Sequence, residues 1–252
     1  MSFDVAAEAY DRYMGRYSAL LSAQMADLAE VRAGQRALDV GCGPGALASE
    51  LVARLGAANV AAADPSESFV AAVRARNPGI EAHRASADDL PFGDGSFDAT
   101  LAQLVVHFMP DPVAGLAEMA RVTRPGGVVA ACVWDHGGRH GPLVIFWAAA
   151  RELDPGVDDE SRLPGVHQGH LVELFGAAGL GAIESATLTA SLDHPTFDSW
   201  WEPFTGGVGP AGAFVASLSP ERQLELRERC RSSLPAAPFT LTALAWAARG
   251  IA

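Results

Sequence analysis

Leu38-Asp39-Val40-Gly41-Cys42-Gly43-Pro44-Gly45 is the stretch of sequence that decides the fold. Residues 36–40 read as a buried strand, and the apolar side chains of residues 47–55 share one face of a helix that ends at Gly56. Glycines let backbone amides come close to a ligand, and the amino terminus of the following helix carries partial positive charge. The stretch therefore predicts a strand, a tight loop and a helix that together bind a nucleotide-like ligand.

The alternation of strand and helix continues along the chain. Sequence patterns predict strands over residues 59–64, 80–85, 97–104 and 128–133, and helices over 66–76 and from 112 to a stop at the Arg-Pro-Gly-Gly of 124–127. They then predict a helix over 170–178, a strand over 183–188 and a strand-like run over 239–248. Short loops between alternating strands and helices predict a mostly parallel sheet covered on both faces, the doubly wound α/β class. No domain boundary is evident, so residues 1–252 are expected to form a single domain.

Three segments precede or interrupt this alternation. Large apolar residues recur at steps of three and four over residues 10–28, which predicts one amphipathic helix or two short ones. Residues 134–167 and 195–234 are insertions that follow the carboxyl ends of strands, where α/β sheets bind their ligands. We therefore expect both insertions to lie on the substrate side of the sheet.

Composition narrows the class of function. The 252 residues are 49% hydrophobic and 19% charged, as in globular proteins with one large core. The 18 basic residues stand against 30 acidic ones, and the net charge of −12 disfavours a nucleic-acid partner and favours a small-molecule substrate. All the basic residues are arginine, so chemistry that needs a lysine amine, such as a Schiff base or a Tyr–Lys hydride-transfer pair, is excluded.

The sequence lacks the signals of membrane or secreted proteins. Its longest uninterrupted apolar run, residues 128–134, is far shorter than the roughly 20 residues that cross a bilayer. The first residues carry acids where a signal peptide would carry basic side chains. Cys42, Cys132 and Cys230 have no spacing typical of a disulfide framework or a zinc site. We expect a cytoplasmic protein with reduced cysteines and no membrane partner.

Two ligand classes are compatible with the glycine loop taken alone. Gly41, Gly43 and Ala46 satisfy the GxGxx[GA] fingerprint of dinucleotide sites, which is a weak signal by itself. Asp64 ends the second predicted strand, 19 residues after Gly45, where a carboxylate can accept hydrogen bonds from both ribose hydroxyls. Dinucleotides and S-adenosyl compounds both offer such a ribose.

Four motifs in fixed order separate these classes. They read LDVGCGPG at 38–45, DPS at 64–66, LPFGDGSFD at 90–98 and RVTRPGG at 121–127. With this set, residues 36–133 resemble the class I S-adenosylmethionine-dependent methyltransferases, in the branch of small-molecule methylases of type 11. The resemblance implies S-adenosyl-L-methionine as cofactor and a Rossmann-like seven-stranded sheet in the order 3-2-1-4-5-7-6, with the last strand antiparallel. It also implies a helical lid over residues 1–33, a cofactor-binding core over 34–133 and the two inserted helical segments.

The resemblance assigns roles to residues at the strand ends. Asp39 orients the glycine loop, whose backbone lines the methionyl part of the cofactor, and Asp64 binds the ribose. At the end of the third strand the family usually has Asp-Ala, whereas this chain has Ser86-Ala87 followed by Asp88, so the contact to the adenine amino group is open between Ser86 and Asp88. The full set of expected cofactor residues is Tyr13, Arg16, Asp39, Gly41, Cys42, Gly43, Asp64, Pro65, Phe69, Ser86, Ala87, Asp88, Gln103 and Leu104.

Several of these roles are specific. Pro65 and Phe69 are expected to pack on the adenine or support its wall, and Gln103 and Leu104 to border the reactive sulfur. Arg16, in the lid segment, has a guanidinium suited to the methionyl carboxylate. The alternative is a surface helix whose tyrosines pack on the sheet while Arg16 is solvated.

The acceptor side is less well defined. His107 follows the fourth strand and is the best-placed general base if the acceptor must lose a proton; the alternative is a structural histidine in a loop that bonds to the backbone. Asp135, His136, His140 and His167 are weaker candidates, and no spacing among them predicts a metal site. Aromatic residues in the insertions line an acceptor chamber or pack the core, namely Phe146, Trp147, Trp200, Trp201 and Phe204.

The hypothesis is therefore methyl transfer to a small, partly apolar metabolite, mainly by positioning and desolvation. The fourth strand is not followed by the Asn/Asp-Pro-Pro-aromatic run of resembling nitrogen methylases of DNA and some proteins, which argues against a macromolecular acceptor. A protein that binds the cofactor without turnover is one alternative. A nicotinamide-dependent oxidoreductase is the other.

Overall fold

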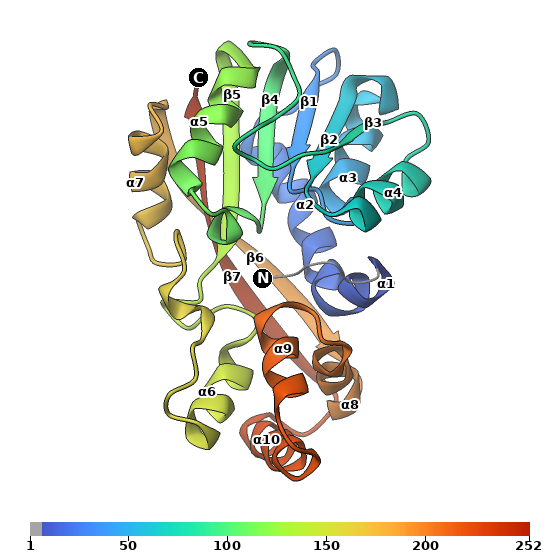
Figure 1. Ribbon diagram of the computed structural model, residues 1–252, viewed down its shortest axis with the longest axis vertical. Helices are drawn as coiled ribbons and strands as arrows, with labels where there is room; N and C mark the ends of the chain where they lie inside the picture. Colours follow the sequence, from blue (N-terminus) through green and yellow to red (C-terminus); the bar gives the residue numbers. More distant parts are fainter. Residues whose placement is uncertain (1–6) are drawn as a thin grey trace.

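The computed structural model describes residues 7–252, whose strands form one seven-stranded sheet in the order β3-β2-β1-β4-β5-β7-β6 (Figure 1). Strands β1 to β5 are parallel, and β7 is antiparallel to both of its neighbours. This confirms the predicted doubly wound Rossmann-like class and its strand order. The strands are β1 Ala37–Val40, β2 Val60–Asp64, β3 Glu81–Arg84, β4 Phe97–Gln103, β5 Thr123–Trp134, β6 Gly181–His194 and β7 Phe239–Ile251.

Helices cover both faces of the sheet (Figure 1). The α-helices are α1 Ala7–Tyr10, α2 Arg16–Leu28, α3 Ala46–Leu55, α4 Glu67–Arg76, α5 Pro112–Val122, α6 Val144–Leu153, α7 His170–Ala177, α8 Phe197–Trp201, α9 Gly209–Ser217 and α10 Pro220–Ser233. A π-helical turn, η1 Asp11–Gly15, joins α1 to α2. Short 3₁₀ turns are η2 Ala57–Asn59, η3 Val106–Phe108, η4 Glu160–Arg162 and η5 Glu202–Gly206.

The position of β5 inside the sheet, between β4 and β7, explains why its sequence is a continuous apolar run. Its side chains alternate between two cores, with Val129, Ala131 and Val133 packed on the side of α5 and α7. Its residues 130, 132 and 134 belong to the core that contains α2 and α3. Because both faces are covered, neither set of side chains can be polar.

Strand and helix boundaries follow local signals, with one correction. Asp111 caps α5 by accepting from the amide of Ala114 at 3.0 Å, as its sequence predicts. The Arg-Pro-Gly-Gly predicted to close this helix instead lies in β5, which begins at Thr123. The Thr123 hydroxyl bonds to Met119 O at 2.7 Å and to Thr100 Oγ1 at 2.6 Å, so the chain turns from helix to strand before the proline.

The two insertions pack together below the sheet. Strands β6 and β7 are longer than predicted and extend toward α8 and α10, and Figure 1 shows α6, α8, α9 and α10 gathered around their far ends. Phe146 of α6 stacks on Phe204 of η5 with ring centroids 4.7 Å apart. The insertions therefore share one core, which is continuous with the core on the α2 side of the sheet.

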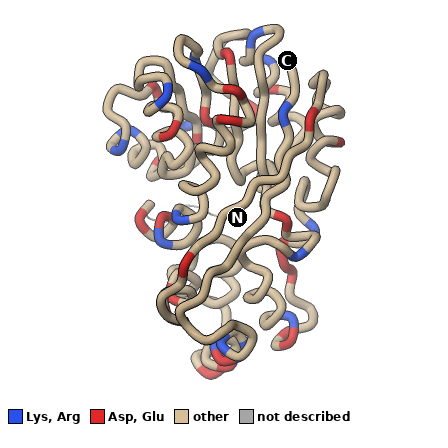
Figure 2. Tube along the Cα trace, turned by 180° about the vertical axis from the view of Figure 1, so that it is seen from behind, with Lys and Arg blue, Asp and Glu red and all other residues tan. Residues whose placement is uncertain are grey.

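Acidic and basic positions are intermixed in the sheet and in the inserted helices (Figure 2). Arg54, for example, bridges Asp27 of α2 and Glu50 of α3. Among residues 7–252, the structure contains no helix that is long and apolar enough to cross a membrane.

Candidate active site at the carboxyl edge of the sheet

The glycine loop after β1 has the backbone conformation that its sequence predicts. Gly41, Gly43 and Gly45 have φ of +67°, +51° and +97°, values that residues with a Cβ rarely adopt. The amides of Gly41 and Cys42 donate to Ala63 O of β2 at 2.8 and 3.1 Å, which fixes the loop across the ends of both strands. A Cβ on Gly41 would lie 2.4 Å from Val105 Cγ2, so only glycine fits there.

Asp64 lies beside this loop at the end of β2. Its Oδ2 accepts from the Gly43 amide and its Oδ1 from the Ser66 amide, each at 2.9 Å. Burial raises the pKa of the carboxyl, while the two amides partly oppose that shift. Each carboxylate oxygen can accept more than one hydrogen bond, so Asp64 holds the loop and retains capacity for a ribose hydroxyl.

Asp39 is the second acid under the loop. It is 1% exposed, and its Oδ2 has no hydrogen-bond partner among the described residues. Burial raises the pKa of Asp39 to about 8, and the negative charge of Asp64 adds to the effect. The carboxyl is therefore largely protonated in the folded protein near neutral pH.

The protonated state of Asp39 predicts a pH dependence of stability. Between about pH 4 and 8 the folded protein holds a proton that the unfolded chain has lost, so stability falls as pH rises, by up to about 1.4 kcal/mol per pH unit. Asp39→Asn removes this pH dependence, so the stability of the variant relative to the wild type is expected to be greater at pH 8 than at pH 5. Urea unfolding at both pH values checks this. An equal difference at the two pH values would show that Asp39 is ionised in the fold.

The expected adenine side is formed by short, exposed segments. Ser86 donates a hydrogen bond to Asp88, so the two alternative partners for the adenine amino group lie together. The Asp88 carboxyl is exposed, and the hydrogen bond from the Ser86 hydroxyl lowers its pKa. Pro65 O accepts from Arg84 Nε at 3.1 Å, while Ala87 lies half-buried beside Gly115.

The amino-terminal helices lie over the glycine loop. Tyr10 is in edge contact with Phe69 at 5.4 Å between centroids, and its ring is the neighbour that a Cβ on Gly43 would meet. Asp11 pairs with Arg76 of α4. Burial raises the pKa of Tyr10 to about 12. The predicted lid segment therefore covers the loop from residue 7 onward, and its residues 1–6 lie outside the described part of the chain.

Two residues expected at the cofactor have other partners. Arg16 donates to Ser199 O at 3.2 Å and Asp193 O at 3.4 Å, so its half-buried guanidinium lies at β6 and α8. Gln103 Nε2 donates to Ser18 O of α2 at 3.0 Å. Gln103 therefore links β4 to the lid helix.

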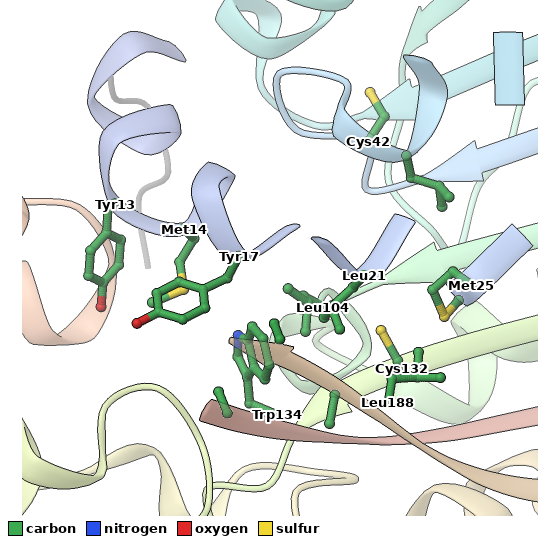
Figure 3. Packing of buried hydrophobic residues seen from close by; sticks show 14 of the residues in the cluster. Tyr13, Met14, Tyr17, Leu21, Met25, Cys42, Leu104, Cys132, Trp134 and Leu188 are labelled. Atoms are coloured by element: carbon green, nitrogen blue, oxygen red, sulfur yellow. The ribbon is translucent and has the colours of Figure 1, made fainter. Parts of the chain in front are cut away.

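A cavity lies between the lid, the carboxyl end of β4 and the insertions. Leu104 directly follows β4 with a left-handed φ of +62°, a rare conformation for a residue with a Cβ, and forms part of the wall. Figure 3 shows Met14 and Tyr17 of the lid facing Trp134, and the rings of Tyr17 and Trp134 are 5.9 Å apart. Most of the wall is apolar.

Three buried polar side chains interrupt that apolar wall. His107 in η3, His136 after β5 and Glu160 in η4 each offer one ligand atom, and these atoms lie within 4.8 Å of one another. Burial lowers the pKa of His107 well below its usual range and that of His136 to about 4, so both rings are neutral. Burial also raises the pKa of Glu160 to about 7. The sequence spacing of these residues did not indicate the cluster.

The aromatic residues proposed for the acceptor chamber have three different positions. Trp147 Nε1 donates to Glu160 Oε2 at 2.9 Å, so it holds the polar cluster. Trp200 lines a second cavity with Tyr13 and Arg16. Phe146 and Trp201 are packed within the core of the insertions, stacked on other rings.

Sequence reasoning missed Glu160 and the contact of Tyr10 with the loop. Glu160 follows two other acids in an insertion, and neither motif nor periodicity marks it; only its 5% exposure distinguishes it. Tyr10 belongs to the segment expected to form the lid, but its contact with Phe69 depends on the tertiary fold.

Comparison with known proteins gives the family. The family described as a methyltransferase domain matches residues 38–131. An uncharacterized methyltransferase from Mycobacterium sp. (strain JLS) is 33% identical over 217 residues, or 82% of this chain and 84% of the relative. A demethylmenaquinone methyltransferase from Clavibacter sepedonicus is 38% identical over 141 residues, or 52% of this chain and 55% of the relative.

Solved structures show the same fold. The YcgJ protein from Bacillus subtilis has a TM-score of 0.60 and 20% identity, with 91% of this chain and 97% of that chain covered. A phosphoethanolamine N-methyltransferase 2 from Haemonchus contortus, in complex with phosphomonomethylethanolamine and S-adenosylhomocysteine, has a TM-score of 0.60 and 18% identity, with 99% and 57% covered. Taken with the four sequence motifs and the strand order, these matches show that the chain belongs to the class I S-adenosylmethionine-dependent methyltransferases.

Proposed function

We propose that this protein transfers a methyl group from S-adenosyl-L-methionine to a small, partly apolar acceptor bound in the cavity between the lid and the end of β4. The observation that carries the proposal is the position of this cavity. Its wall contains Tyr10, which lies over the glycine loop, and Leu104 at the end of the strand next to β1. Cofactor residues and an acceptor cavity are thus adjacent.

The residues around the glycine loop fit the cofactor. Positive φ at Gly41 and Gly43 lets the loop backbone approach a ligand closely, and Asp64 can accept from the ribose. The cofactor supplies, when bound, an electrophilic methyl group on a sulfonium. Phe69 is 3% exposed and supports the wall on the adenine side.

The chain's own contribution to methyl transfer is positioning and removal of water. Tyr13, Met14 and Trp134 form an apolar enclosure in which an acceptor can be held in line with the methyl group. His107 is neutral, and its Nδ1 has no hydrogen-bond partner among the described residues. It is the group we expect to take the proton of an acceptor hydroxyl or amine, whose acidity rises as the new bond to carbon forms.

The lining of the cavity supports a small acceptor. A mostly apolar wall with a few polar groups is typical of small-molecule pockets. Several relatives are named demethylmenaquinone methyltransferases, which supports an acceptor with substantial apolar surface.

A transfer assay tests the proposal. The purified protein is incubated with S-adenosylmethionine labelled in the methyl group and a panel of quinols, phenols and small amines, and label in the extracted acceptors is counted. We expect at least one apolar hydroxyl or amine acceptor to be labelled, and His107→Ala to lower kcat by roughly 10²-fold or more if the proton transfer is catalysed. Binding of S-adenosylhomocysteine with no labelled acceptor would favour a protein that binds the cofactor without turnover.

The lid gives a separate prediction. Because the lid covers the loop through Tyr10, it must open for the cofactor to enter and should close again over it. Hydrogen exchange over residues 7–21 is therefore expected to slow on addition of S-adenosylhomocysteine. Arg16→Ala is expected to leave cofactor affinity unchanged, because Arg16 bonds to β6 and α8. Equal exchange with and without S-adenosylhomocysteine would show that the segment does not act as a lid. A large loss of cofactor affinity in Arg16→Ala would show that Arg16 binds the cofactor.

A further inference from the structure

We propose that His107, His136 and Glu160 form a binding site for one divalent transition-metal ion of the Zn²⁺ class, which binds an oxygen atom of the acceptor. Three separate elements bring these side chains together, since they come from η3, the segment after β5 and η4. The contact between the ion and the acceptor rests on the proposed function, whereas the metal site itself is independent of it.

The spacing of the ligand atoms supports a metal ion. His136 Nε2 and Glu160 Oε1 are 3.9 Å apart, too far for a hydrogen bond, and all three ligand atoms lie within 4.8 Å of one another. An ion bound at about 2.0–2.2 Å from nitrogen and oxygen ligands places them roughly 3–4 Å apart. Side-chain shifts of less than about 1 Å would therefore bring all three atoms into coordination.

The donor set selects the kind of ion. Two neutral imidazoles and one carboxylate are the protein ligands of one class of catalytic zinc sites and of the facial-triad iron sites, which leave at least one position open. Mg²⁺ and Ca²⁺ prefer sites made of oxygen atoms. One carboxylate also leaves a divalent ion with net positive charge, which favours an oxygen ligand with partial or full negative charge.

The surroundings orient the cluster as a ligand set. Trp147 Nε1 holds Glu160 Oε2, which leaves Oε1 directed at His136. His107 is 3% exposed, and its Nδ1 is buried without a hydrogen-bond partner among residues 7–252. A buried imidazole nitrogen without a partner is costly unless something binds it. The cluster is thus a buried set of donors with unused capacity.

The position of the cluster suggests its role. All three side chains line the cavity that also contains Leu104, so an open coordination position would face the acceptor. A bound ion would lower the pKa of an acceptor hydroxyl, whose proton would leave to water before methyl transfer. The ion would then replace His107 as the group that activates the acceptor, and metal dependence of the activity separates these two roles.

Metal binding is measured directly on the full chain. Protein freed of metal by a chelator is titrated with Co²⁺, followed by its visible d–d absorption, and with Zn²⁺ by calorimetry. We expect one ion per chain and no comparable heat with Mg²⁺. His107→Ala, His136→Ala and Glu160→Gln should each weaken binding by more than about 100-fold, and Trp147→Phe, which removes only the Nε1 donor, by roughly tenfold.

Two matched controls locate the site. His83→Ala removes an exposed histidine that pairs with Glu81 at 3.1 Å, and His140→Ala removes one that pairs with Asp135 at 2.7 Å. Both are expected to keep full metal affinity. Absence of stoichiometric binding in the wild type, or binding that survives Glu160→Gln but not His140→Ala, would overturn the proposal.

Binding of S-adenosylhomocysteine is measured on the same samples. It shows that each variant is folded, because the glycine loop and Asp64 are outside the cluster. Metal binding without cofactor binding would support the metal site and overturn the proposed function. Cofactor binding without metal binding would overturn the metal site and leave the proposed function standing.

Discussion

Gly41→Ala is expected to destabilise the protein by roughly 2–5 kcal/mol, combining the cost of left-handed backbone with that of an overpacked contact. Gly41 has a φ of +67°, and its new Cβ would lie 2.4 Å from Val105 Cγ2 and 2.8 Å from Val105 Cβ. The loop and the segment after β4 must therefore separate. Denaturant unfolding measures the loss, and the affinity for S-adenosylhomocysteine should fall with it.

Gly34→Ala is the matched control for this substitution. Gly34 has a φ of +89°, but a Cβ there would meet nothing within 4 Å. It is expected to lose only about 1–2 kcal/mol, the backbone cost alone. The double variant Gly41→Ala, Val105→Ala should recover part of the difference, because two of the three clashing atoms are removed. Equal losses for Gly34→Ala and Gly41→Ala would show that the clash with Val105 is absent.

Asp64→Ala is expected to lower the affinity for S-adenosylhomocysteine by roughly 1.5–3 kcal/mol, as a charge-assisted bond to the ribose hydroxyls is lost. The structure adds a second effect, because the Gly43 and Ser66 amides also lose their acceptor. Some loss of stability should accompany the loss of affinity. Asp89→Ala, which removes an exposed acid a few residues past β3, is expected to change neither quantity. An unchanged dissociation constant for Asp64→Ala would show that this residue does not bind the ribose.

The cofactor half of the fold could be predicted from sequence because its signals are local. Positive φ at Gly41 and Gly43 is a property of a few residues, as is the cap that Asp111 places on α5. The order of the strands was not a local signal. It followed from the resemblance carried by four motifs, and the pairing of β7 between β5 and β6 confirms it.

The acceptor half could not be predicted because it is built by packing between distant segments. Glu160 meets His107 and His136 only because the first insertion folds back over the strand ends. Arg16 was expected at the cofactor from its place in the lid segment and its guanidinium, and the carbonyl groups of β6 and α8 that bind it come from distant parts of the sequence. The Arg-Pro-Gly-Gly stop was predicted from turn propensity, but Thr123 starts the strand earlier through its hydrogen bond to Thr100.

Calorimetric titration of the wild-type protein with S-adenosylhomocysteine and, separately, with NAD and NADH tests the central claim most directly. The glycine loop alone is compatible with both classes of ligand, whereas the methyltransferase family favours the S-adenosyl class. We predict saturable binding of one S-adenosylhomocysteine per chain and no measurable heat with either nicotinamide cofactor. Tight binding of NAD or NADH with no affinity for S-adenosylhomocysteine would contradict the account.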